Sequence, residues 1–217
     1  MSILIMSKKQ TTKERLIEAA SEIFARKGFR ETTVAEICEV SKANIAAVNY
    51  HFGDKTKLYL AVWNYLYEAS QNQFPVPKTH KGLDPETWLR QFLHSRLQQI
   101  TAEGTGSLFP KLIHHEMTEI TAEHEQILLT YLRPNHLHVR NAIRDFMGES
   151  ISEEQLSVAT LNFMGVHISM NLGYQKQVQH PALQKEFPLI IHSEDVLQQI
   201  EHFAFGGLNE VKKGLSQ

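Results

Sequence analysis

The residues with the clearest chemical pattern lie between Val34 and Phe52, in the run VAEICEVSKANIAAVNYHF. Asn44 is a favoured N-cap residue, so a short helix is predicted from Ile45 to about Tyr50. Val48 is expected to face inward, while small and amide side chains face outward: Ala46, Ala47 and Asn49. Small side chains let a backbone approach base edges, and an asparagine amide can pair with adenine. The pattern therefore predicts contacts in a DNA major groove.

Residues on either side of this short helix could hold DNA phosphates. Asp54 is expected to cap the next helix, and a helix N-terminus that carries a lysine is a ready phosphate site. The predicted phosphate contacts are Thr33, Tyr50, His51 and Lys55. Phosphate contacts fix the register of a protein on DNA, whereas base contacts specify the sequence. The alternative is an ordinary three-helix core with an exposed alanine-rich turn.

Two capping boxes, at residues 11–14 and 33–36, begin the helices that must position this region. Gly28 is expected to end the first helix, and a bend at Val40 to Ala43 separates the second helix from the third. Two short helices joined by a tight bend form the layout of a helix-turn-helix, whose second helix enters the major groove. The spacing thus predicts a three-helix DNA-binding head.

Taken together, TTV, NYHF and GDKTKLY resemble the N-terminal domain of the TetR family of bacterial transcriptional repressors, from about Thr11 to Val62. The resemblance implies base contacts at Ile45, Ala46, Ala47 and Asn49, beside the cap Asn44. It also implies phosphate contacts at Thr33, Tyr50, His51 and Lys55. Family members usually have Ala-Gly at the bend, where this chain has Ser41-Lys42. Because a side chain disfavours positive φ by about 1 kcal/mol, we expect Lys42 to form a slightly different turn and to add a phosphate contact.

Composition and charge agree with this interpretation. The 217 residues are 42% hydrophobic and 21% charged, which indicates a globular protein. Residues 1–60 carry a formal charge of +3 and the remainder −5, a basic head on an acidic body, although so small an excess is also compatible with chance. The single cysteine, Cys38, excludes an intramolecular disulfide and suits a cytoplasmic location. We expect no membrane contact, and we expect the start MSILIM to be a loose terminus or to precede a true start at Met6.

Apolar stripes at helical spacing continue to the end of the chain and predict an all-α fold of about nine helices. We divide it into a DNA-binding domain, residues 1–57, and a helical effector-binding and dimerisation domain, residues 58–217. A long helix is predicted from about Thr121 to Met147, with a kink at Pro134, which cannot donate a backbone hydrogen bond. Ser193 is expected to cap the last helix.

The last two long helices carry more apolar surface than one protomer can cover, which predicts a four-helix interface across a two-fold axis. The interface residues predicted are Phe163, Val166, Met170, Leu197, Ile200, Phe203 and Ala204. The alternative is a hairpin buried within one chain. A dimer would read two half-sites about 34–36 Å apart, which favours the interface.

The resemblance also implies a small-molecule effector, held in a pocket between helices of the body. The candidate lining is Phe92, Phe109, Ile113, His114, Tyr131, Met164, His167 and Met170. His167 is the strongest single candidate because it is titratable and lies within an apolar helix, although each of these residues also suits an ordinary core. NIAAVNYHFGDKTKLYLAV and LFPKLIHHEMTE further resemble the CecR-like branch of the family, and no ligand is inherited from it.

Other chemistries find little support. The twelve histidines include His114-His115 and His136-x-His138, but adjacent and i,i+2 residues on a helix point apart, so we expect no metal site and no cofactor. No nucleophile–base spacing or glycine-rich phosphate loop predicts an enzyme. The predicted function is a DNA-binding regulator, in the simplest case a repressor that binds a palindromic operator as a homodimer and is released by an effector. A ligand-dependent activator and an enzyme built on the body remain alternatives.

Overall fold

The computed structural model describes residues 10–180, 182–186 and 194–215. The expected loose start and the expected cap at Ser193 lie outside these residues. Within them, every regular element is a helix, nine of them with seven or more residues, which confirms the all-α prediction. None of the described helices is long and apolar enough to cross a membrane.

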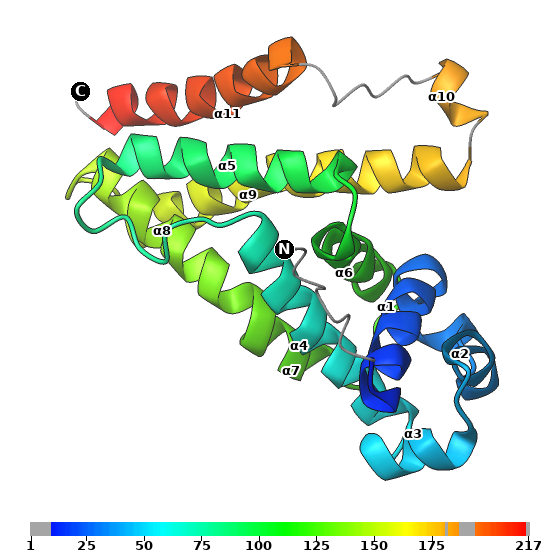
Figure 1. The fold of residues 1–217 in the computed structure, drawn as a ribbon. Coiled ribbons are helices and arrows are strands. Elements are labelled where there is room, and N and C mark those ends of the chain that lie inside the picture. The colour runs from blue at the N-terminus through cyan, green and yellow to red at the C-terminus, as the bar shows by residue number, and fades with distance from the viewer. Residues whose placement is uncertain (1–9, 181, 187–193, 216–217) are drawn as a thin grey trace, which may run out of the picture.

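Three helices and the start of a fourth form the lower end of the molecule in Figure 1: α1 (Thr12–Glu31), α2 (Val34–Ser41), α3 (Ile45–His51) and α4 (Lys55–Gln73). We call residues 11–57 the head. The predicted caps at Thr11, Thr33, Asn44 and Asp54 are all present, each accepting a backbone N–H three residues later. Gly28 breaks α1 with a φ of 76° and a ψ of 179°, so the first regular helical run ends there as predicted, and residues 29–31 form a short helical turn after the kink.

The body continues with α5 (Pro85–Thr101), a 3₁₀ turn (Thr105–Ser107), α6 (Leu108–Thr118), α7 (His124–Ile127), a π-helical segment (Leu128–Leu132), α8 (Arg133–Met147), α9 (Glu153–Gln179), α10 (Leu183–Glu186) and α11 (Glu194–Leu215). In Figure 1, α5, α9 and α11 run alongside one another, and α6 lies between them and the head.

The predicted kinked helix at 121–147 is divided into α7, the π-helical segment and α8. Pro134 is the second residue of α8, which follows the π-helical segment without a gap. The irregularity falls just before it, in a π turn that widens the spacing of hydrogen bonds. The proline is therefore accommodated by a change of helix type one turn earlier.

Two apolar cores hold the molecule together. One contains residues of α5, α8, α9 and α11. The other begins in the head and continues through α4 to Phe109 and Leu112 on α6 and to Tyr131. The domain boundary after residue 57 stays a prediction, and the second core crosses it without a break. Because the head shares this close-packed core with α4 and α6, movement of either helix would change its contacts with the head.

Candidate functional site

The bend between α2 and α3 holds Lys42 in the left-handed conformation, with φ 52° and ψ 42°. Our expectation of a different turn at this lysine is therefore wrong. The Ala43 N–H donates to the Cys38 carbonyl at 2.9 Å, and Arg15 Nε of α1 donates to the Ser41 carbonyl at 3.1 Å. These bonds offset a strain of about 1 kcal/mol, so the bend is fixed from both sides.

The orientation of α3 follows from its cap and its one buried side chain. Asn44 Oδ1 accepts the Ala47 N–H at 2.9 Å, and Val48 is fully buried in the head core. Ala47, predicted to face outward, is half-buried beside Val48. The outer face carries exposed side chains, with Ile45 55% and Tyr50 85% exposed: Ile45, Ala46, Asn49 and Tyr50. An outward amide among apolar groups can reach base edges and thymine methyls.

The predicted phosphate contacts border this outer face. Thr33 is exposed at the N-terminus of α2, and Tyr50 and His51 lie at the end of α3 with their rings 5.0 Å apart. Lys55 begins α4, and its ammonium lies 4.4 Å from the centre of the Phe29 ring. Partial burial lowers the pKa of Lys55. The lysine is thus held in place by packing as well as by its charge.

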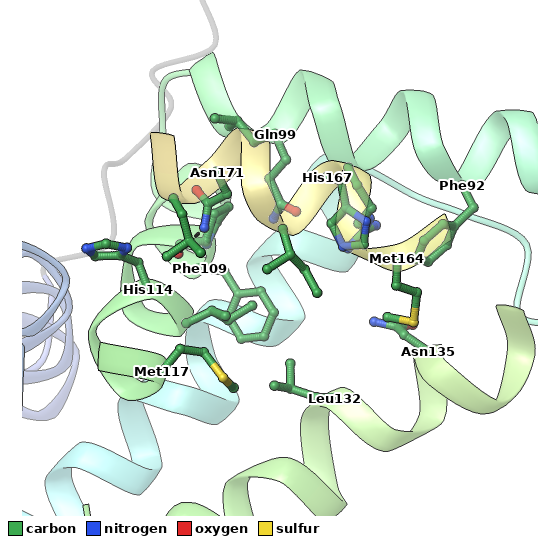
Figure 2. A pocket seen from close by; sticks show the side chains of 16 residues that line it. Phe92, Gln99, Phe109, His114, Met117, Leu132, Asn135, Met164, His167 and Asn171 are labelled. Atoms are coloured by element: carbon green, nitrogen blue, oxygen red, sulfur yellow. Dashed lines mark hydrogen bonds between the residues drawn. The ribbon is translucent and has the colours of Figure 1, made fainter. Parts of the chain in front are cut away.

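A pocket of about 150 Å³ lies between α5, α6, α8 and α9 (Figure 2). Six of the eight predicted effector residues line it: Phe92, Phe109, Ile113, His114, Met164 and His167. Tyr131 does not, because its ring stacks on Trp63 at 5.6 Å in the core shared with the head. Met170 does not either, since it faces the groove between α9 and α11. Brought together, the six make a largely apolar site.

Sequence reasoning missed several polar residues of this pocket, above all Arg96, Gln99, Asn135 and Asn171. Arg96 is only 8% exposed, and its Nη2 donates to the Phe74 carbonyl at 3.1 Å and to Ser95 Oγ at 3.3 Å. A signal was present, because this arginine lies one turn after Phe92 within the apolar stripe of α5. An arginine in such a stripe indicates a buried polar function more specifically than a phenylalanine does.

Burial controls the charge of the pocket. It lowers the pKa of His167 to about 3, with the positive charge of Arg96 as a second cause, so the imidazole is neutral at pH 7. It also lowers the pKa of Arg96 to about 10, which leaves the guanidinium protonated. The pKa of His114 is lowered by burial, then by His115 and Lys176. At neutral pH the pocket therefore holds one fixed positive charge, on Arg96.

Helix α6 connects the pocket to the head. Phe109, Ile113 and Met117 of α6 line the pocket, whereas His115 packs against α1. A Cβ at Gly28 would lie 3.0 Å from His115 Nδ1, so glycine permits this close approach of the two helices. Glycine also suits the positive φ found there. Helices α6 and α1 are thus in direct contact at this point.

A buried carboxylate ties α6 to α4 as well. Glu116 is fully buried and accepts the Tyr59 hydroxyl of α4 at 2.8 Å. It also accepts the Thr121 N–H at 3.1 Å and contacts His124 Nδ1 at 2.9 Å. A buried acceptor satisfied by several donors fixes its surroundings, because each donor would otherwise lose a bond. Helices α4, α6 and α7 are therefore held as one unit.

The predicted dimer residues gather on α9 and α11, along an apolar groove of about 1160 Å³. Six of the seven line it: Phe163, Val166, Met170, Ile200, Phe203 and Ala204. Leu197 lies instead in the body core, because it faces back into its own protomer. Phe203 is 78% and Leu161 is 68% exposed, and nothing in the described part of the chain covers them. Exposure of such large apolar side chains to water is unfavourable and is typical of an interaction surface.

This fold and site define a class of protein, in which a helix-turn-helix head is packed on a helical body with an internal pocket. Comparison with known families agrees. Residues 16–62 match the family model described as bacterial regulatory proteins, tetR family, and residues 85–204 match the C-terminal domain of the HTH-type transcriptional dual regulator CecR. The second match alone covers more than half of the chain. The chain belongs to the TetR family, and it is a DNA-binding transcriptional regulator.

Individual proteins show the same likeness. The chain is 23% identical to the HTH-type transcriptional regulator TtgR of Pseudomonas putida, over 94% of this chain and 92% of TtgR. It is 27% identical to the dual regulator CecR of Shigella flexneri, over 76% and 78%. Among solved structures, a TetR-like regulator from Rhodococcus sp. RHA1 superposes with a TM-score of 0.64 at 13% identity, covering 93% of this chain and 98% of that one. The structural likeness shows the shared fold.

Proposed function

We propose that the protein acts in the cytoplasm as a homodimeric repressor of a palindromic operator, and that a small molecule bound in the body releases it from DNA. The observation that carries the proposal is the outer face of α3, where Ile45 and Tyr50 are exposed although Val48 is anchored in the core. A helix held so firmly, with apolar and amide groups turned outward, suits insertion into a major groove. The activity is regulation and not catalysis.

Within the proposed DNA-binding domain, residues 1–57, base contacts fall on Ile45, Ala46, Ala47 and Asn49. Phosphate contacts fall on Thr33, Lys42, Tyr50, His51 and Lys55. Asn44 contributes by positioning α3, because its side chain caps the N-terminus of that helix. Ala47 is half-buried, so its contact would be the smallest of the base contacts. The lysines and Tyr50 act on all sequences alike, whereas Asn49 distinguishes among them.

The dimer forms through α9 and α11 of residues 58–217. Support comes from the groove between these helices and from the exposed rings and aliphatic groups that border it. Two copies of this face would cover Phe203 and Leu161 in a four-helix arrangement. A two-fold axis there would also hold two heads at a fixed separation, as a palindromic operator requires.

The effector acts by binding one of two arrangements of the body more tightly than the other. A molecule in the pocket touches Phe109 and Ile113 of α6, and α6 contacts α1 directly and α4 through Glu116. A ligand changes DNA affinity only through its different affinity for the two arrangements, typically about 1–3 kcal/mol of coupling. Displacement of α6 would change the separation of the heads and weaken operator binding.

A second candidate is a regulator that also activates, because the relative from Shigella flexneri is named a dual regulator. The same head and dimer would serve both modes. Transcription from a bound promoter in a purified system separates them: repression lowers the transcript in proportion to occupancy, and activation raises it.

The deciding experiment selects genomic fragments with the purified protein and measures binding to each by gel shift, including DNA upstream of its own gene. We expect a palindromic sequence to be enriched, with a stoichiometry of two chains per site. Phe203→Glu on the groove should abolish the dimer and the shift, while Glu210→Gln, an exposed change on the same helix, should leave both intact. Absence of any selected sequence, or a monomer that binds equally well, contradicts the proposal.

A further inference from the structure

The two central arginines of α5 have opposite surroundings. Arg90 pairs with Glu86 at 2.6 Å and lies 3.8 Å from Glu201. Arg96, almost two turns later, forms no ion pair with any described carboxylate, although it is only 8% exposed. A buried guanidinium normally has a carboxylate partner, because taking its charge out of water is costly. Arg96 has only carbonyl and hydroxyl oxygens, both bound by Nη2.

Three of the five buried side-chain nitrogens without a hydrogen-bond partner in the described part of the chain belong to residues that line one pocket. They are Arg96 Nε, His114 Nδ1 and His167 Nδ1. The Arg96 guanidinium lies 5.6 Å from the Phe92 ring, and that ring lies 5.8 Å from the His167 ring. An arginine, an imidazole and an aromatic face thus converge on one end of the cavity.

Most of the remaining wall is apolar and is formed by Ile100, Phe109, Ile113, Met117, Leu132 and Met164. The amide side chains of Gln99, Asn135 and Asn171 also line the space seen in Figure 2. An apolar cavity of about 150 Å³ is large enough for one benzene ring. The methionines adapt to an aromatic guest and contact its edge favourably. The cavity therefore suits a guest with one flat apolar ring and one group that meets the guanidinium.

We propose that the effector is a small organic monoanion, a single-ring aromatic carboxylate, whose carboxylate binds Arg96 while its ring fills the cavity between Phe92 and Phe109. Arginine presents a planar fork that matches a carboxylate with two parallel bonds. A neutral His167 adds one further hydrogen bond without a second positive charge, which favours a monoanion over a dianion. This inference rests on the proposed effector control, and it adds the chemical class.

Calorimetric titration of the full-length protein with benzoate and with benzamide tests the inference. The two probes have nearly the same size and differ in charge. We expect benzoate to bind roughly 10- to 100-fold more tightly, the difference typical of a hydrogen bond to a charged group. Arg96→Met should abolish this preference, and Arg90→Met on the same helix should keep it. Equal binding of the two probes, no binding of benzoate, or a preference that survives Arg96→Met overturns the inference.

A second measurement needs no variant and so stands if Arg96→Met fails to fold. Because Arg96 stays protonated, benzoate affinity should be constant from about pH 6 to about pH 8. A steady loss of affinity as the pH rises through this range would identify a histidine as the cation and overturn the assignment to Arg96.

Operator binding measured with the same probes separates the two proposals. If benzoate binds through Arg96 and the gel shift is unchanged, the carboxylate site at Arg96 holds and effector-controlled release fails. If benzamide binds equally well and releases the DNA, release holds and the anion inference fails.

Discussion

The head and the pocket treat their polar groups in opposite ways. In the head, Thr11, Thr33, Asn44 and Asp54 each satisfy a backbone N–H at the start of a helix. In the pocket, Arg96, His114 and His167 keep buried nitrogens without a partner among the described residues. A satisfied group gives rigidity, whereas an unsatisfied buried group costs stability and is available to a ligand. The caps of the head therefore favour one rigid conformation, whereas the pocket offers polar groups to which a ligand can bind.

The junction between the two regions should show the largest effect on stability. Glu116→Ala removes the buried acceptor shared by Tyr59, Thr121 and His124. Leaving these donors unpaired should lower the free energy of unfolding by about 3 kcal/mol or more. Urea denaturation measures the change, with the exposed Glu119→Ala as control. A loss below about 1 kcal/mol would mean that α6 and α4 are not held together by this network.

The pocket should make the protein sensitive to acid. The folded-state pKa of His167 is about 3, below the ordinary value of about 6.5, so between these two values the unfolded chain binds the extra proton. Stability therefore falls as the pH decreases below about 6.5, by at most about 1.4 kcal/mol per pH unit from this group. His167→Phe should flatten the dependence and leave stability at pH 8 unchanged or slightly higher. Thermal melts across this range test it, and an unchanged slope in the variant would refute the burial of a neutral imidazole.

In the head, removal of a polar side chain should lower stability, whereas His167→Phe in the pocket should not. Asn44→Ala deletes the cap of α3 and should lower the free energy of unfolding by about 1 kcal/mol. Asn44→Ser, which can accept the same N–H, should restore most of that stability. Denaturation midpoints measure both variants. If alanine and serine are equivalent, the cap does not hold α3 in place.

The head could be predicted from the sequence because its signals are local. A cap and the N–H that it accepts are three residues apart, so Thr33 and Asn44 reveal their helices directly. Even there, Lys42 was misjudged, since Arg15 holds the bend from a different helix. Of the eight residues predicted for the pocket, six are among the sixteen that line it. The sequence does not reveal the role of Arg96. That role depends on the absence of an ion pair with any described carboxylate, which only the three-dimensional arrangement shows.

The most direct test of the reading head compares Lys55→Ala and Asn49→Ala with the wild-type protein on a pool of selected and random fragments at several salt concentrations. Lys55→Ala should weaken binding to all sequences and reduce the slope of log affinity against log salt by about 1. Asn49→Ala should instead change which fragments are preferred. If Lys55→Ala leaves affinity and slope unchanged, and Asn49→Ala weakens every fragment equally, α3 and the start of α4 are not the surface that reads DNA.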